Sequence, residues 1–138
     1  MDKFNKMLAG GEPMVLSIFR IITGLLLFQY GVAKILKFPV LPYFASPPPL
    51  IMTAGGIELV GGALLILGLL TRPVAFILSG EMAFAYFMGH MLKNPAEPVF
   101  IPLLSGGNAA ILFCFACLYL AFAGGGVWSA DALIRKKG

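Results

Sequence analysis

Charged residues are scarce in this chain of 138 residues. Asp, Glu, Lys and Arg together make up 12% of it, and there are only one histidine and two cysteines. This scarcity excludes a soluble domain of ordinary composition, in which about a quarter of the residues are charged. Several catalytic centres are excluded too, because the sequence has no phosphate-binding glycine loop, no haem-attachment motif, no histidine pair for a bis-histidine haem and no persuasive Ser/His/Asp set.

Apolar residues take the place of the missing charges. They make up 59% of the chain, and its mean hydropathy is +0.94. Four apolar stretches, at residues 15–33, 50–70, 74–91 and 108–127, each approach the ~20 residues that a helix needs to cross the ~30 Å hydrocarbon core of a membrane. The sequence therefore predicts an all-α membrane protein, with a single domain over residues 1–138 that forms a bundle of four transmembrane helices.

Basic residues are distributed unevenly between the two ends of this predicted bundle. With four spans, both termini share one end with the turn at residues 71–73. That end carries Lys3, Lys6, Arg72, Arg135, Lys136 and Lys137, and the other end carries Lys34, Lys37 and Lys93. Because basic flanks stay in the cytoplasm, both termini are predicted to be cytoplasmic. This positive charge is attracted to anionic lipid head groups, so the predicted partner is the lipid bilayer. The charge gives no support for nucleic-acid binding.

Two stripes of small and polar residues indicate which helix faces contact protein. In both, the steps of three and four residues place the members on one side of a helix. The first stripe is Arg20, Gly24, Leu27, Gly31 and Lys34, and the second is Gly55, Glu58, Gly62 and Leu65. Small residues at this spacing let two helices approach closely in lipid. Both stripes are therefore predicted to face the inside of the bundle.

Three residues of the charged types Asp, Glu, Lys and Arg lie inside the predicted spans. A charge there costs at least about 2.5 kcal/mol, so each residue needs a partner or a proton. Arg20 and Glu81 both lie about 10 Å from the cytoplasmic end, and we predict that they form a structural charge pair. Glu58 lies in the outer half near Gln29, with no cation at its own level, although Lys34 could reach it along the wall. Glu58 is either a functional site that binds a ligand or a proton, or a polar clamp between helices.

The remaining candidates lie near the ends of the spans or in the fourth one. His90, one turn beyond Tyr86, is either a polar helix terminus or part of the Glu58 site. No second histidine or cysteine has ligand spacing with it, so no metal site is predicted. Cys114 and Cys117 have the C-x-x-C spacing of redox dithiols, but apolar surroundings disfavour the reactive thiolate. We expect these cysteines to be packing residues.

Four segments of the chain, in this order and spacing, resemble the DoxX family of small four-helix membrane proteins. They are RIITGLLLFQYGVAK from Arg20, GGIELVGGALLILGLLTR from Gly55, EMAFAYFMGH from Glu81 and GGGVWSADAL from Gly124. The resemblance implies a bundle in the bacterial inner membrane. It directs attention to Arg20, Gly31, Lys34, Glu58, Arg72, Ser129 and Asp131. The family name comes from a subunit linked to quinol oxidation, and some relatives look like anchors of oxidative-stress complexes.

The resemblance and the polar residues together predict a small membrane subunit that supports a redox complex. It would bind a quinone or a related isoprenoid lipid between its helices, at a site formed by Glu58, Gln29, Lys34, Tyr86 and His90. No covalently bound cofactor is predicted, so a soluble or membrane partner would carry the electrons and the chain would be at most an accessory oxidoreductase subunit. The alternative is a non-catalytic assembly or anchor protein, or a carrier of protons or a small solute. Homo-oligomers are compatible with both.

Overall fold

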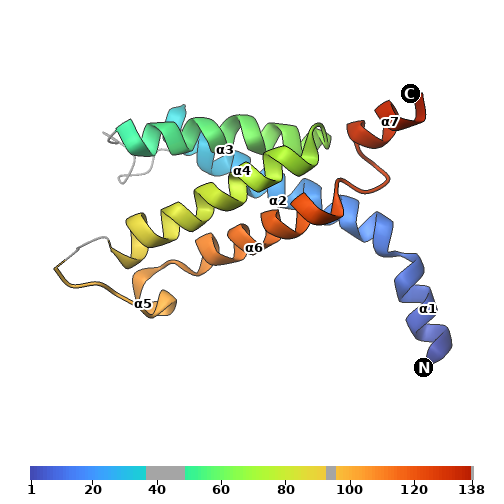
Figure 1. The fold of residues 1–138 in the computed structure, drawn as a ribbon, viewed down its shortest axis with the longest axis horizontal. Helices are drawn as coiled ribbons and strands as arrows, with labels where there is room; N and C mark the ends of the chain where they lie inside the picture. The colour runs from blue at the N-terminus through green and yellow to red at the C-terminus, as the bar shows by residue number, and fades with distance from the viewer. Residues whose placement is uncertain (37–48, 93–95, 138) are drawn as a thin grey trace.

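The protein folds as a bundle of helices that run side by side (Figure 1). The structure, a computed structural model, describes residues 1–36, 49–92 and 96–137. Along the chain the helices are α1 (Asp2–Gly10), α2 (Glu12–Ile35), α3 (Pro49–Leu67), α4 (Thr71–Phe84), the π-helical η2 (Ala85–Met91), α5 (Pro102–Ser105), α6 (Asn108–Ala123) and α7 (Ala130–Lys137). The Lys37 and Lys93 positions used to predict the orientation lie outside the described residues.

The four predicted spans correspond to α2, α3, α4 with η2, and α6. The first three helices are long and apolar enough to cross a membrane, and α4 continues into η2 as one helix from Thr71 to Met91. The fourth, α6, has 16 residues and ends at Ala123, because the next residue, Gly124, adopts a φ of +84° that is incompatible with an α-helix. The chain is thus an all-α protein with three long apolar helices and one shorter helix, and the last span is shorter than predicted.

The order of packing places α2 against α3, α3 against α4, and α4 against α6 (Figure 1). Both termini lie at the end of the bundle where α3 turns into α4, which we call the terminal end. The short helix α5 lies at the opposite end, against η2. The prediction that both termini share one end of the bundle is confirmed.

The contact between α2 and α3 is close because glycines face the opposite backbone. A Cβ atom on Gly62 would lie 2.7 Å from the backbone nitrogen of Phe28, and one on Gly24 would lie 2.8 Å from the Cβ atom of Leu65. A Cβ atom on Gly31 would come closer still to the backbone of Leu59. Since real side chains never approach so closely, only glycine fits at these three positions. The inward orientation predicted for both stripes is confirmed, because their members are buried except for the partly buried Lys34.

Large apolar side chains cover the outside of the bundle. A soluble monomer rarely exposes contiguous apolar patches of more than a few hundred Å², so this surface is suited to hydrocarbon. Exposed examples on α2, α4 and α6 are Ile18, Ile22, Leu25, Phe76, Ile77, Leu112 and Phe115.

Candidate functional site

An ion pair links α2 to α3 inside the bundle. The Nζ atom of Lys34 donates hydrogen bonds to both carboxylate oxygens of Glu58, at 2.7 Å to Oε2 and 3.0 Å to Oε1. Glu58 is 1% exposed and Lys34 is 14% exposed. A Cβ atom on Gly55 would lie 2.7 Å from the Cβ atom of Lys34, so the lysine stem passes over this glycine on its way to the carboxylate.

A second carboxyl group, that of Glu81 on α4, adjoins this pair. Both of its oxygens are buried and have no hydrogen-bond partner among the described residues. The group is nevertheless close enough to Glu58 and Lys34 to interact electrostatically with both. We call Lys34, Glu58 and Glu81 the carboxyl cluster. One cation facing two buried carboxyl groups is electrically balanced when one of the two holds a proton.

The turn between α3 and α4 sets the heights of the two carboxyl groups. This turn is tight, with Gly68 at a φ of +72° and Leu70 at a φ of +53°. Glu58 precedes Leu70 by twelve residues and Glu81 follows it by eleven. Because the two helices run antiparallel from a common turn with the same rise per residue, the carboxyl groups reach the same level near the middle of the bundle.

The predicted charge pair between Arg20 and Glu81 is wrong. Glu81 is the eleventh of the 21 residues from Thr71 to Met91, near the middle of that helix, whereas Arg20 lies at the terminal end. Glu58 has its cation in Lys34, which reaches the carboxylate along the wall of the bundle, as the sequence allowed. The error arose because depths were counted from separate apolar stretches. Counting from the shared turn would have placed the two carboxyl groups together.

Arg20 instead links the end of α3 to the loop before α7, at the terminal end of the bundle. Its side chain is 1% exposed and donates to four backbone carbonyl oxygens. Two belong to the last turn of α3 (Leu65 at 2.8 Å and Ile66 at 3.4 Å), and two to the loop before α7 (Gly125, and Trp128 at 2.8 Å). Carbonyl groups in the last turn of a helix have no partner within the helix and carry partial negative charge. A cation is therefore well placed there.

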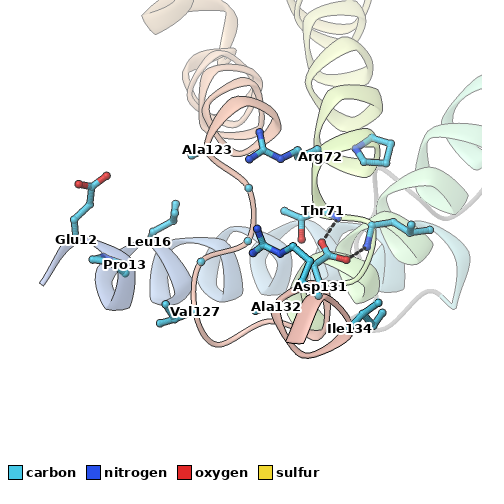
Figure 2. Close-up of a pocket in the computed structure, with 16 residues that line it drawn as sticks. Glu12, Pro13, Leu16, Thr71, Arg72, Ala123, Val127, Asp131, Ala132 and Ile134 are labelled. Carbon is cyan, nitrogen blue, oxygen red and sulfur yellow. Dashed lines mark hydrogen bonds between the residues drawn. The ribbon is translucent and has the colours of Figure 1, made fainter. Parts of the chain in front are cut away.

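Two more charged residues cap helices at the same end (Figure 2). Asp131 accepts hydrogen bonds from the backbone N–H groups of Leu70 (2.8 Å) and Thr71 (2.9 Å), at the start of α4. Arg72 donates to the carbonyl oxygens of Ala121 and Phe122, at the end of α6. Burial alone would raise the pKa of Asp131, but its hydrogen bonds and the charge of Arg135 hold that pKa below its ordinary value.

Ser129 completes this arrangement as the residue before α7. Its hydroxyl group donates to the carbonyl oxygen of Gly126 at 2.9 Å and accepts from the N–H group of Ala132 at 3.1 Å. Of the residues to which the resemblance directs attention, Arg20, Arg72, Ser129 and Asp131 thus act on backbone groups at the terminal end. Lys34 and Glu58 belong to the carboxyl cluster.

The structure does not assemble the rest of the predicted site. Gln29 is exposed on α2, five residues before Lys34 and on a different side of the helix. The hydroxyl group of Tyr86 lies 3.5 Å from the carbonyl oxygen of Phe100, and Nδ1 of His90 lies 3.3 Å from that of Ser105. Tyr86 and His90 therefore contact the segment around α5, at the far end of the bundle.

The two cysteines are free thiols on the side of α6 that faces α4. Cys117 is completely buried in the core beside Leu78 and Leu120. The hydroxyl group of Ser79 donates to the carbonyl oxygen of Cys114 at 2.8 Å. These contacts favour the interpretation that Cys114 and Cys117 are packing residues.

We expect the double variant Cys114→Ser/Cys117→Ser to fold normally and to lose less than about 1 kcal/mol of stability, because a buried serine hydroxyl can bond to the carbonyl four residues earlier. Melting temperatures in detergent would measure this. In the native protein, we also expect Cys117 to react with a maleimide only after unfolding. Rapid labelling of the folded protein would revive the redox interpretation.

Comparison with known proteins places the carboxyl cluster in a region shared with other chains. Residues 15–91 match the model of the DoxX family. An uncharacterized protein of Haemophilus influenzae is 41% identical over 129 residues, which cover 91% of this chain and 95% of the relative. No solved structure matches the chain significantly. The segment matched by the family model runs from α2 through η2, so it contains all three residues of the carboxyl cluster.

Proposed function

The chain belongs to the DoxX family of membrane proteins, and from this premise we propose that it is a small inner-membrane subunit that supports a redox complex. In this proposal a quinone or a related isoprenoid lipid binds beside the carboxyl cluster. The supporting observation is the cluster itself, in which a buried ion pair and a second carboxyl group meet between three apolar helices. Ionisable groups inside a membrane are costly, and they commonly mark ligand or proton sites.

The chemistry of a quinone fits these three groups. Reduction of a quinone to a quinol takes up two electrons and two protons, and oxidation of the quinol returns them. The redox partner supplies these electrons to the quinone and accepts them from the quinol. The ammonium group of Lys34 can donate a hydrogen bond to one head-group oxygen, and the protonated carboxyl group exchanges one proton with that oxygen. Water exchanges the second proton with the other head-group oxygen.

Aromatic rings beside the cluster suit the flat head group. The ring centroid of Tyr30 lies 5.9 Å from the Nζ atom of Lys34, and Tyr30 packs edge to face against Phe113 at 6.2 Å. Tyr30 is partly exposed on the outside of the bundle. A quinone that arrives from the hydrocarbon could therefore stack near Tyr30 and reach Lys34.

Quinone titration in nanodiscs tests this proposal. Wild-type protein should bind a short-chain ubiquinone analogue saturably, measured by calorimetry. Glu81→Gln keeps the ion pair but removes the exchangeable proton, and we expect binding to weaken by up to about tenfold, as for the loss of one hydrogen bond between uncharged groups. Gln29→Ala, on the exposed side of α2, is the control and should bind like wild type. Wild-type protein that retains no quinone on extraction and binds none when titrated would refute the proposal.

A second candidate is an anchor without a catalytic role, and the terminal end favours it. Arg20, Arg72, Ser129 and Asp131 there engage backbone groups at four helix ends, those of α3, α4, α6 and α7. Such an end could present a rigid surface to a soluble oxidase or dismutase. Cross-linking in native membranes followed by purification distinguishes the candidates, because the anchor requires a protein partner even when quinone binding fails.

We further propose that the terminal end faces the cytoplasm, as the bias of basic residues indicates. A fluorescent protein fused after Gly138 should fluoresce, and alkaline phosphatase fused at the same position should be inactive. Phosphatase inserted after Glu97, at the opposite end, should be active. An active phosphatase after Gly138 would reverse the orientation.

A further inference from the structure

A cleft of about 920 Å³ opens at the terminal end, away from the carboxyl cluster (Figure 2). The starts of α2 and α4, the loop of residues 123–127, and α7 line it. Its walls include the apolar side chains of Leu16, Val127 and Ile134, and its charged lining residues include Arg72 and Arg135. The cleft therefore combines a surface for hydrocarbon with groups that bind anions.

One edge of the Arg72 guanidinium group is available to a ligand. Its hydrogen bonds to the end of α6 use the Nη1 atom alone, and within the part of the chain that the structure describes Nε and Nη2 donate none. A Cβ atom on Gly124 would lie 3.2 Å from Nη2 and 3.4 Å from both Cζ and Nε, so the glycine keeps a side chain off the face of this group. Two parallel N–H groups on one edge of a guanidinium group match the oxygens of a phosphate.

The acidic residues that line the cleft do not cancel this preference. Asp131 directs its two oxygens to the N–H groups of Leu70 and Thr71, and its charge is thereby stabilised within the protein. Glu12 is exposed at the start of α2, and Figure 2 shows it apart from Arg72.

The position of the cleft points to a lipid. It lies where α2 and α4 begin and α6 ends, which is the level of lipid head groups for helices that span a membrane. We propose that the cleft binds one anionic phospholipid. The phosphate of this lipid contacts the Nε and Nη2 edge of Arg72, Arg135 provides a second positive charge, and an acyl chain runs along the apolar wall.

The single tryptophan supplies the probe, because Trp128 is exposed and directly follows Val127 in the cleft wall. The full chain is placed in nanodiscs whose phosphatidylcholine is partly replaced by lipid with brominated acyl chains, which quenches nearby tryptophan fluorescence. Brominated phosphatidylglycerol should quench at lower mole fractions than brominated phosphatidylcholine, with a relative binding constant of about five or more, as for one basic group at an anionic surface.

Variants show whether the preference belongs to this cleft. Arg135→Gln should lower the relative binding constant about fivefold. Arg72→Lys should lower it less, because lysine keeps the charge and loses the two-pronged contact. Lys6→Gln on α1, which removes a basic residue of the same end outside the cleft, is the matched control and should behave like wild type. Arg135 is exposed and caps no helix, so Arg135→Gln decides the question even if Arg72→Lys destabilises the fold.

Three results would overturn the proposal. The wild-type protein could be quenched equally by both lipids. Lys6→Gln could weaken the preference as much as Arg135→Gln, which would indicate attraction to the charged surface as a whole. Inorganic phosphate in the buffer could abolish the preference at constant ionic strength, which would assign the cleft to a free anion in place of a lipid.

Discussion

Arg20→Gln is expected to lower the free energy of unfolding by at least about 3 kcal/mol, because it removes the hydrogen bonds of a buried guanidinium group to carbonyl oxygens at the end of α3 and in the loop before α7. A hydrogen bond to a charged group contributes about 1.5 to 3 kcal/mol, and Arg20 makes two buried ones, to Leu65 and Gly125, and two partly buried ones, to Ile66 and Trp128. A glutamine side chain is shorter and has only two N–H groups, so it cannot join both segments. Unfolding by SDS in mixed micelles, followed by circular dichroism, measures the difference.

Arg72→Gln is the matched control for this experiment. Arg72 also donates to carbonyl groups at a helix end, but it is exposed, so water can replace its hydrogen bonds. We expect a loss of less than about 1 kcal/mol. Equal losses for the two variants would show that the burial of Arg20 does not determine its contribution.

The carboxyl cluster should respond to substitution in a graded order. Glu81→Gln keeps the pair between Lys34 and Glu58, so we expect a loss of less than about 1 kcal/mol. Glu58→Gln removes the negative charge and one of the two acceptors of Lys34, and it should cost about 1.5 to 3 kcal/mol, because Glu81 can still act as a more distant counter-ion. The double variant leaves Lys34 facing no carboxylate in the cluster and should cost about 3 to 5 kcal/mol.

Non-additivity is the informative outcome of this series, because groups that share a partner have coupled effects. The same SDS titration serves for all variants. A control with Lys34→Met added to the double variant removes the remaining charge, and it should recover much of the loss. A loss for Glu81→Gln that exceeds the loss for Glu58→Gln would contradict the arrangement of the ion pair.

The sequence predicted the helices and their inward faces because hydropathy and glycine spacing are local patterns. The stripe that contains Gly24 and Gly31 is one example, since its residues face α3 as expected. The partners of the buried charges were not predicted, because they depend on how the helices align along one another. A shift of one helix turn is about 5 Å, enough to exchange the partner of Glu81.

The roles of Arg20 and Asp131 were beyond sequence patterns for another reason. Their partners are backbone groups, which every residue carries, and so no residue type marks them in advance. The predicted site also combined residues from the middle of the bundle with residues from its far end. Gln29 lies on a side of α2 that faces away from the carboxyl cluster, and Tyr86 and His90 lie at a different level of the bundle. Glu81, which does belong to the cluster, was assigned to a different partner.

The hydrogen bonds of Arg20 have a consequence for synthesis of the protein. Arg20 enters the membrane with the first long helix, but two of its acceptors, on Gly125 and Trp128, follow it by 105 and 108 residues. Until the ribosome has translated that late segment, the buried guanidinium group lacks part of its compensation. A nascent or prematurely terminated chain therefore differs from a complete one by an unsatisfied charge in lipid, a feature by which membrane proteases can distinguish the two.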